Sequence, residues 1–373
     1  MKIGIIKTSL KENEKRLPIH PDHIKYIDPK VRKSLYFENN YGTEFMMSDT
    51  EILNLGACML TRDEILHESD LVVLPKPMSD DLKRAKKGAI VWGWMHCVQQ
   101  TDIAQHAIDN NLTYVSWEAM HTWVNNTKNM HIFYRNNELA GYASVIHSLQ
   151  LLGMDGLYGE RKKVVIFGYG SVSKGAITAL HGRGFNNITV LSKREFHLIA
   201  DKNPDVYFKS YSMQGQKLMV NDLTGKEYLI DYLRDADIII NGILQNVKSP
   251  VTFIQYKDVG NLKPGCLIID ISCDKGMGFE FARPTSFIEP IIEIEHLHYY
   301  SVDHTPSYLW RAATREISLC VLPFLKDISE GLSGIEQNEI LAKAVEMKNG
   351  IIVNDDIISF QNRLSNPPYQ IKC

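Results

Sequence analysis

The chain has 373 residues, a formal net charge of −3 and an ordinary share of apolar residues, which favours two globular domains. It has no basic excess, so the electrostatic signature of a nucleic-acid-binding protein is missing. No apolar run is long enough to span a bilayer, and the N-terminal residues are typical of a strand rather than of a secretory signal. Six cysteines without paired spacing argue against a zinc site and against a disulfide framework. We therefore expect a cytoplasmic protein without a metal.

The first 138 residues alternate short apolar runs with helical stretches, which is typical of an α/β fold with a parallel sheet. The expected buried strands cover residues 3–6, 71–74, 89–94 and 114–117. Lys76 stands between two prolines directly after one of these strands, and His96 follows another. The carboxyl edge of such a sheet usually lines the binding cleft. From these patterns alone, an exposed loop lysine is an equal alternative for Lys76, and a lone histidine beside tryptophans is more often structural.

Residues 163–176 read Lys-Val-Val-Ile-Phe-Gly-Tyr-Gly-Ser-Val-Ser-Lys-Gly-Ala. A short apolar run followed by Gly168 and Gly170 predicts the first turn of a dinucleotide-binding βαβ unit, in which a helix N-terminus binds the pyrophosphate. Ser173 occupies the place of the third glycine. A helix expected over 174–183 and a second strand over 187–191 complete the unit. A glycine turn in an α/β fold without a nucleotide is the alternative.

The second strand of this unit ends in Ser192, Lys193 and Arg194. An NAD site usually has an acidic residue here, which bonds the ribose 2′-hydroxyl. A serine and two cations instead suit a 2′-phosphate, so the sequence favours NADP(H) over NAD(H). The alternative is that both cations belong to a solvated turn.

Beyond the nucleotide-binding unit, further strands are expected over 236–242 and 265–270, and a long helix over 140–152 precedes the glycine turn. Thr305 and Pro306 predict the start of another helix, which runs to about residue 327 and leads into an α-rich C-terminal segment. The expected domains are 1–138 with 304–373 for the substrate and 139–303 for the dinucleotide.

Seven segments, in order along the chain, resemble the alanine dehydrogenase and transhydrogenase family, and within it the N5-(carboxyethyl)ornithine synthases. They cover residues 11–21, 93–96, 140–143, 168–176, 240–243, 265–274 and 299–307. The resemblance implies an α/β fold of two Rossmann-like domains with parallel sheets and a cleft between them, in a formate/glycerate dehydrogenase-like arrangement. It covers most of the chain and weakens beyond residue 328. We also expect a homo-oligomer.

The resemblance also implies roles for individual residues. Arg16 matches an arginine that grips the substrate carboxylate, and Lys76 matches a second substrate-binding cation. His96 matches the catalytic histidine, whose imidazole can exchange a proton near neutral pH. Asp274 matches the catalytic carboxylate, whereas Asp270 is interpreted as a structural acid at a strand end.

Further residues are assigned to substrate and cofactor. Glu118 matches an acidic position in the cleft. The implied cofactor contacts are Gly168, Gly170, Ser171, Val172, Ser173, Ser192, Lys193, Arg194, Asn241 and Gly242. Two positions depart from alanine dehydrogenases: the family aspartate at the ribose is Ser192, and His304 lies in a segment that reads Ala-Asn-Met-Pro in those enzymes. His304 is therefore a candidate contact for a second substrate.

The expected function is an NAD(P)H-dependent oxidoreductase that acts on CH–NH bonds. It joins a pyruvate-like 2-oxo acid to an amino acid by reductive condensation and yields an opine-type N-carboxyalkyl amino acid. The alternatives are reductive amination with ammonia, as in alanine dehydrogenases, and saccharopine-dehydrogenase-like chemistry. A non-catalytic nucleotide-binding regulator or transhydrogenase domain is disfavoured, because Arg16, Lys76, His96 and Asp274 are all present.

Overall fold

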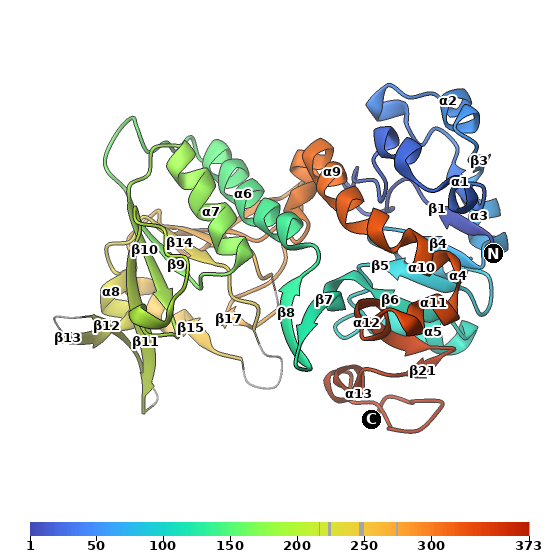
Figure 1. Cartoon of the computed structure of the whole chain (residues 1–373). Coiled ribbons are helices and arrows are strands. Elements are labelled where there is room, and N and C mark those ends of the chain that lie inside the picture. Colours follow the sequence, from blue (N-terminus) through green and yellow to red (C-terminus); the bar gives the residue numbers. More distant parts are fainter. Residues whose placement is uncertain (216, 223–224, 246–249, 274, 373) are drawn as a thin grey trace. The chain divides into compact units, whose positions relative to one another are not determined.

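The computed structural model describes residues 1–215, 217–222, 225–245, 250–273 and 275–372. The chain divides into two compact units, residues 1–134 with 310–373 and residues 135–309, and both are α/β (Figure 1). These boundaries lie a few residues from the domain limits expected from the sequence. Within the described residues, no helix is both long and apolar enough to cross a membrane.

The first unit is built on an eight-stranded sheet with the order β21-β20-β6-β5-β4-β1-β2-β3. Its strands are β1 (Ile3–Ile5), β2 (Leu35–Glu38), β3 (Cys58–Leu60), β4 (Leu71–Val73), β5 (Ile90–Gly93), β6 (Thr113–Ser116), β20 (Val345–Lys348) and β21 (Ile351–Ile352). Strands β1 to β6 pair in parallel, whereas β20 is antiparallel to β6 and to β21. A separate hairpin consists of β7 (His121–Val124) and β8 (Thr127–His131).

Helices cover both faces of this sheet, which explains why its strands read as apolar runs. The helices are α1 (Pro29–Arg32), α2 (Asp49–Asn54), α3 (Arg62–Glu68), α4 (Ser79–Lys83), α5 (Thr101–Asn110), α9 (Trp310–Val321), α10 (Leu325–Ser329), α11 (Leu332–Gln337), α12 (Glu339–Ala342) and α13 (Asp355–Phe360). Val73 and Trp92 share a core with α9 and α10. On the opposite face, Val72 packs with α3 and Val91 packs with α5.

The second unit contains a nine-stranded sheet with the order β13-β12-β11-β10-β9-β14-β16-β19-β18. Its strands are β9 (Lys163–Phe167), β10 (Asn187–Ser192), β11 (Tyr207–Gln214), β12 (Lys217–Asp222), β13 (Gly225–Tyr228), β14 (Ile238–Asn241), β16 (Leu267–Asp270), β18 (Ile291–Ile294) and β19 (Leu297–Tyr300). Six neighbouring strands of this sheet pair in parallel: β11, β10, β9, β14, β16 and β19. They follow the 3-2-1-4-5-6 order of dinucleotide-binding folds. A short pair, β15 (Thr252–Ile254) and β17 (Gly278–Phe279), lies apart from the large sheet.

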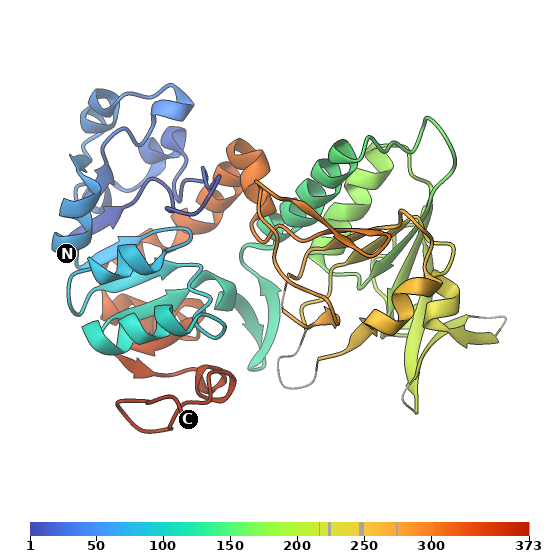
Figure 2. The same cartoon turned by 180° about the vertical axis from the view of Figure 1, so that it is seen from behind.

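The helices of the second unit are α6 (Tyr134–Leu151), α7 (Ser171–Gly182) and α8 (Leu229–Leu233). Val164 and Ile166 of β9 pack with α6 and α7, whereas Val165 and Phe167 pack with α8 on the other face. Helices α6 and α7 lie side by side in both views (Figures 1 and 2).

Short 3-10 turns complete both units. They are η1 (Pro21–Tyr26), η2 (Thr43–Phe45), η3 (Trp117–Ala119), η4 (Phe196–Leu198), η5 (Tyr256–Asn261), η6 (Thr305–Leu309) and η7 (Leu322–Phe324).

The structure confirms the two Rossmann-like α/β domains but corrects three expected elements. The helix expected from residue 305 to 327 is divided into η6, α9, η7 and α10. The break between α9 and α10 falls at Pro323, which has no N–H to continue the α-helical ladder. Helix α6 begins at Tyr134 rather than at residue 140. The C-terminal segment was expected to be α-rich, yet it also supplies β20 and β21 to the first sheet.

Candidate active site

Four predicted site residues of the first unit follow neighbouring parallel strands. Arg16 lies on the segment after β1, Lys76 after β4, His96 after β5 and Glu118 after β6. These strands are adjacent in the sheet, in the order β6-β5-β4-β1. The carboxyl ends of parallel strands meet at one edge, so the fold brings all four residues to that edge.

His96 and Glu118 are in direct contact. The His96 backbone N–H donates to Glu118 Oε1 at 2.5 Å, and His96 Nδ1 lies 4.0 Å from the same oxygen. His96 has a φ of +48°, which is uncommon for a residue with a side chain. Such conformations concentrate at functional sites, where the surrounding structure holds them.

Glu118 lies in η3, at the end of β6, in surroundings that oppose its ionisation. Burial, reinforced by the negative charge of Glu346, raises the pKa of Glu118 to about 8. Backbone hydrogen bonds, including the one from His96, favour the charged form but do not offset these two effects. Among the described residues, buried Glu118 Oε2 has no hydrogen-bond partner. The raised pKa therefore favours the neutral carboxyl form of Glu118 near pH 7.

Arg16 is buried and already paired within the first unit. Its Nε and Nη2 donate to the two carboxylate oxygens of Glu14, at 2.8 and 2.5 Å. Its guanidinium carbon lies 5.0 Å from the centre of the Trp94 ring. This pairing fixes the guanidinium plane, and in the described part of the chain only Nη1 makes no hydrogen bond. Glu14 was not predicted, because the charged run 11–16 resembles a solvated surface.

Lys76 is buried at the neighbouring strand end. The carbonyl of Pro75 accepts a hydrogen bond from the Trp94 backbone N–H at 2.9 Å, which ties the Lys76 turn to the segment that leads to His96. Trp94 thus connects three of the predicted residues. The Arg16 guanidinium lies over the Trp94 ring, and the Trp94 backbone bonds to the residue before Lys76. His96 follows Trp94 by two positions. The result is one polar cluster at the carboxyl edge of the first sheet.

In the second unit, the glycine turn lies where the strand order reverses, between β9 and β14. Gly168 follows β9 with a φ of +87°, a conformation that favours glycine. Gly242 follows β14, and its N–H donates to the Phe167 carbonyl at 3.1 Å. A Cβ on Gly242 would lie 2.4 Å from Ser173 Oγ, so Ser173 packs tightly at the third-glycine position. Dinucleotides bind at such switch points.

The N-terminus of α7 fits an anion. A Cβ on Gly170, the N-cap residue, would meet no atom within 4 Å, so the backbone there is open. No side chain caps the helix, whose first turn contains Ser171, Val172 and Ser173. Unpaired N–H groups at a helix start bind phosphate. The turn therefore has the open backbone that a pyrophosphate needs.

The end of β10 carries both signs of charge. Lys193 and Arg194 are exposed, and the Arg194 backbone N–H donates to Ser192 Oγ at 3.0 Å. Glu195 follows directly, and both its carboxylate oxygens lie 3.2 Å from Ser210 Oγ. The sequence interpretation overlooked Glu195, although it is only three residues beyond Ser192.

Two other predicted residues have internal partners in the second unit. Asn241 Nδ2 donates to Asp270 Oδ1 at 3.0 Å, and Tyr299 donates to Asp270 Oδ2 at 2.8 Å. The Asn241 side chain is thereby fixed within the fold. His304 is buried, with Nδ1 2.7 Å from an oxygen of Asp303. Asp274 lies outside the described residues.

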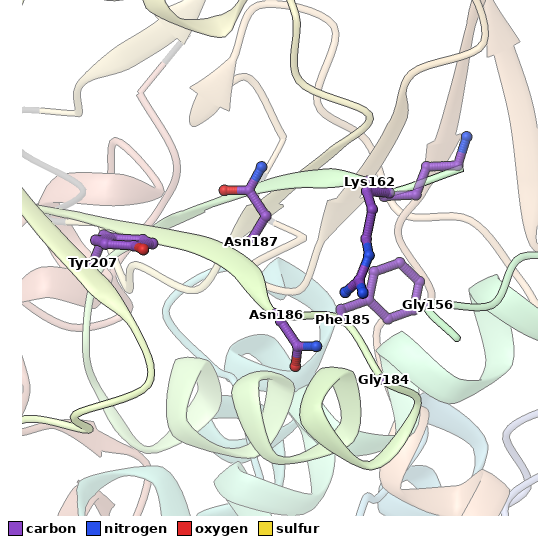
Figure 3. A pocket seen from close by; sticks show the side chains of 8 residues that line it. Gly156, Lys162, Gly184, Phe185, Asn186, Asn187 and Tyr207 are labelled. Carbon is purple, nitrogen blue, oxygen red and sulfur yellow. The ribbon is translucent and has the colours of Figure 1, made fainter. Parts of the chain in front are cut away.

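A cavity of about 270 Å³ in the second unit is not the nucleotide site. Lys162, which precedes β9, and Asn187, which begins β10, line it together with Tyr207 (Figure 3). It therefore lies at the amino ends of these strands, the edge opposite the glycine turn.

Comparison with protein families matches the chain to two adjoining family models. Residues 4–140 match the N-terminal domain of alanine dehydrogenase/PNT, and residues 147–355 match its C-terminal domain. The chain belongs to the alanine dehydrogenase/PNT family. The matched residues include both candidate sites, which are the strand ends of the first unit and the glycine turn of the second.

Relatives of two kinds align along most of this family member. An N(5)-(carboxyethyl)ornithine synthase from Clostridium botulinum is 28% identical over 85% of this chain and 92% of its own. Alanine dehydrogenase 1 from Staphylococcus aureus is 26% identical over 96% of both chains. One relative is named a synthase and the other a dehydrogenase, and their identities to this chain differ by only two percentage points.

Solved structures share the fold. An L-alanine dehydrogenase superposes with a TM-score of 0.78 at 20% identity and covers 96% of this chain and 99% of its own. A transhydrogenase from Sinorhizobium meliloti gives a TM-score of 0.68 at 16% identity over 95% of this chain and its full length.

Proposed function

We propose that this family member is an NADPH-dependent opine-type reductase. It condenses a pyruvate-like 2-oxo acid with the amine of an amino acid and reduces the product to an N-carboxyalkyl amino acid. The observation that carries the proposal is the polar cluster at the carboxyl edge of the first sheet, where His96 contacts Glu118 beside the strand ends that carry Lys76 and Arg16. The name of the Clostridium botulinum relative supports an amino-acid amine as the second substrate.

The proposed reaction forms an imine and then reduces it. The amine adds to C2 of the 2-oxo acid and water leaves, which gives an imine; one hydride and one proton then convert the C=N bond into a secondary amine. The reduced cofactor, whose pyrophosphate the glycine turn would hold, would supply the hydride. The chain must therefore hold the carboxylate, protonate the departing oxygen and exclude competing water.

Each residue of the first unit has a proposed role in this reaction. Lys76 and the remaining N–H groups of Arg16 bind the 2-oxo acid carboxylate and orient C2. His96 delivers the proton to the oxygen that leaves as water. Glu118, as a neutral carboxyl group, donates a hydrogen bond to the substrate without repelling its carboxylate.

Two further assignments rest on the family resemblance. Asp274 is the proposed second catalytic carboxylate. His304, whose Nδ1 lies 2.7 Å from Asp303, is the proposed contact for the second substrate. We also propose that the protein is a homo-oligomer.

The product of the reaction tests the proposal directly. With pyruvate and NADPH, we expect a mixture of amino acids to yield a conjugate heavier than its parent amino acid by the mass of C₃H₄O₂. Mass spectrometry of the products, with ammonia alone as the parallel reaction, distinguishes the two kinds of relative. Formation of alanine without any conjugate would establish the alanine-dehydrogenase alternative instead.

The cofactor preference is a separate prediction. Replacing both Lys193 and Arg194 by serine should weaken NADPH binding more than NADH binding by about 1–3 kcal/mol, the scale of charge-assisted hydrogen bonds. The expected cause is the loss of two exposed cations beside Ser192. Fluorescence titration with each cofactor measures the difference, with Lys226→Ser on β13 as the control. Equal weakening of both cofactors would exclude this turn as the phosphate site, and Glu195 would then favour NADH.

A further inference from the structure

The C-terminal segment places a buried carboxylate behind the proposed acid–base residues. Glu346 lies on β20, which pairs with β6 through Val345 opposite Val115 and Met347 opposite Tyr114. The register shifts between these two pairs, so Glu346 falls at the irregularity. It is 7% exposed. At this irregularity a charged side chain of β20, which lies between β21 and β6 in the sheet, is directed toward the interior.

Glu346 bonds to both segments that carry the proposed acid–base residues. Its Oε2 accepts hydrogen bonds from Cys97 Sγ at 2.8 Å and from Ser116 Oγ at 2.6 Å. Cys97 directly follows His96, and Ser116 lies two residues before Glu118. Glu346 Oε1 accepts a hydrogen bond from Asn354 Nδ2 at 3.0 Å. One carboxylate thus joins the end of β5 to the end of β6.

A second contact from the same segment secures the residues after His96. Gln361 Nε2 donates to the carbonyls of Cys97, at 2.6 Å, and Val98, at 3.1 Å. Gln361 is itself held by Arg363, whose Nε donates to Gln361 Oε1 at 2.6 Å. Arg363 is 1% exposed and also donates to the Thr101 carbonyl at 3.2 Å. The C-terminal segment therefore fixes the loop in which His96 adopts its left-handed conformation.

The charge of Glu346 also acts on its neighbours. Within the described chain, its three side-chain donors are all neutral groups, so no cation cancels its negative charge. This charge raises the pKa of Cys97, in addition to burial, and opposes ionisation of Glu118. Two histidines also lie near Glu118. His96 Nδ1 is 4.0 Å from its carboxylate, and His131, whose pKa is lowered to about 4 chiefly by burial, interacts with its backbone.

We propose that Glu346 is a positioning residue, which fixes His96 and Glu118 relative to each other at the carboxyl edge of the first sheet. This inference rests on the proposed function, in which these two residues act on the substrate. It assigns a role to the C-terminal strand, which brings a carboxylate to the site from more than 200 residues away in sequence.

The Glu346→Gln variant tests this role, because it keeps the size of the side chain and removes its charge. We expect kcat to fall about 10- to 100-fold, the scale of losing charge-assisted hydrogen bonds. The Kd for NADPH should stay unchanged. Removing a negative charge stabilises ionised Glu118, so its pKa falls. We expect the alkaline limb of the kcat profile near pH 8 in the wild type, and it should move to lower pH in this variant.

Two further variants separate charge from structure. Glu346→Asp keeps the charge but shortens the reach, so its alkaline limb should stay near pH 8 while kcat falls. Glu336→Gln is the matched control, because it removes an exposed carboxylate of α11 that bonds to Lys348, a residue of the same strand as Glu346. An unshifted pH profile in Glu346→Gln, with wild-type kcat in Glu346→Asp, would overturn the proposal. If Glu346→Gln fails to fold, Glu346→Asp alone decides through its kcat.

A titration without substrate separates this inference from the proposed function. With ¹³C-labelled glutamate side chains, NMR follows the ionisation of Glu118, whose signal is identified by its loss in Glu118→Gln. We expect the midpoint to move to lower pH in Glu346→Gln. If this shift occurs but no amino acid conjugate forms, the proposed function fails and the coupling of Glu346 to Glu118 stands. An unchanged midpoint would contradict the coupling itself.

Discussion

The His96→Asn variant is expected to turn over about 10²–10⁴-fold more slowly than the wild type while its affinity for NADPH stays nearly unchanged. An asparagine amide cannot exchange a proton at neutral pH, so the departing oxygen loses its proton donor. Asparagine is nevertheless one of the few residues that readily adopt a positive φ, so it keeps the +48° conformation and the N–H bond to Glu118. Steady-state kinetics and NADPH titration measure the two quantities.

This substitution separates the chemical step from cofactor binding, because His96 and the glycine turn belong to different units. Loss of the imidazole leaves Gly168, Gly170 and the start of α7 untouched. His67→Asn on α3, where His67 bonds only to the Asp63 carbonyl within the described residues, is the control and should keep full turnover. Turnover of His96→Asn close to the wild-type value would remove His96 from the mechanism.

The strands that carry the site were predictable from the sequence because both faces of each parallel sheet are covered. Residues such as Val72 and Val73 pack into different cores, so each strand reads as an unbroken apolar run with a polar end. A polar residue directly after such a run must lie at the carboxyl edge of the sheet. Lys76 and His96 could therefore be placed without the structure.

The partners of the site residues were not predictable in the same way. Glu14 stands in a charged run that looks solvated, yet it is buried against Arg16. Glu346 belongs to a short strand with alternating polar residues in a segment expected to be helical. Its pairing with Ser116 joins positions 230 residues apart, and no local pattern in the sequence encodes such a contact.

The direction of the Asn241 side chain could not be predicted from the sequence either. Asn241 was assigned to the cofactor because it follows a strand at the predicted switch point. In the structure its amide bonds to Asp270, so any role in binding falls to the backbone of Asn241 and Gly242. The position in the fold could be predicted from the order of strands, whereas the direction of the side chain depends on packing with β16.

A second large effect is expected where α6 crosses α7. A Cβ on Gly175 would lie 1.8 Å from the Glu138 carbonyl oxygen, and a Cβ on Gly141 would lie 1.8 Å from the Val172 carbonyl oxygen. Two glycines, one on each helix, thus allow the backbones to touch. Both distances are far below van der Waals contact, and the opposing atoms are backbone atoms that no change of rotamer can move.

We expect Gly175→Ala to destabilise the protein by about 3 kcal/mol or more, the upper end of the range for overpacking. The helices must separate to admit the methyl group, and α7 is the helix whose N-terminus is proposed to bind the pyrophosphate. NADPH affinity should therefore fall together with the free energy of unfolding. Denaturant unfolding and NADPH titration measure the two effects on the same preparation.

Gly182→Ala is the matched control, because it makes the same chemical change on the same helix. A Cβ on Gly182 would meet no atom within 4 Å, and alanine has the higher helix propensity. This variant should be stabilised by up to about 1 kcal/mol and should bind NADPH normally. If Gly175→Ala were as stable as Gly182→Ala, α6 and α7 could not cross as closely as the structure indicates. If Gly175→Ala were destabilised but bound NADPH normally, the N-terminus of α7 would not be the pyrophosphate site.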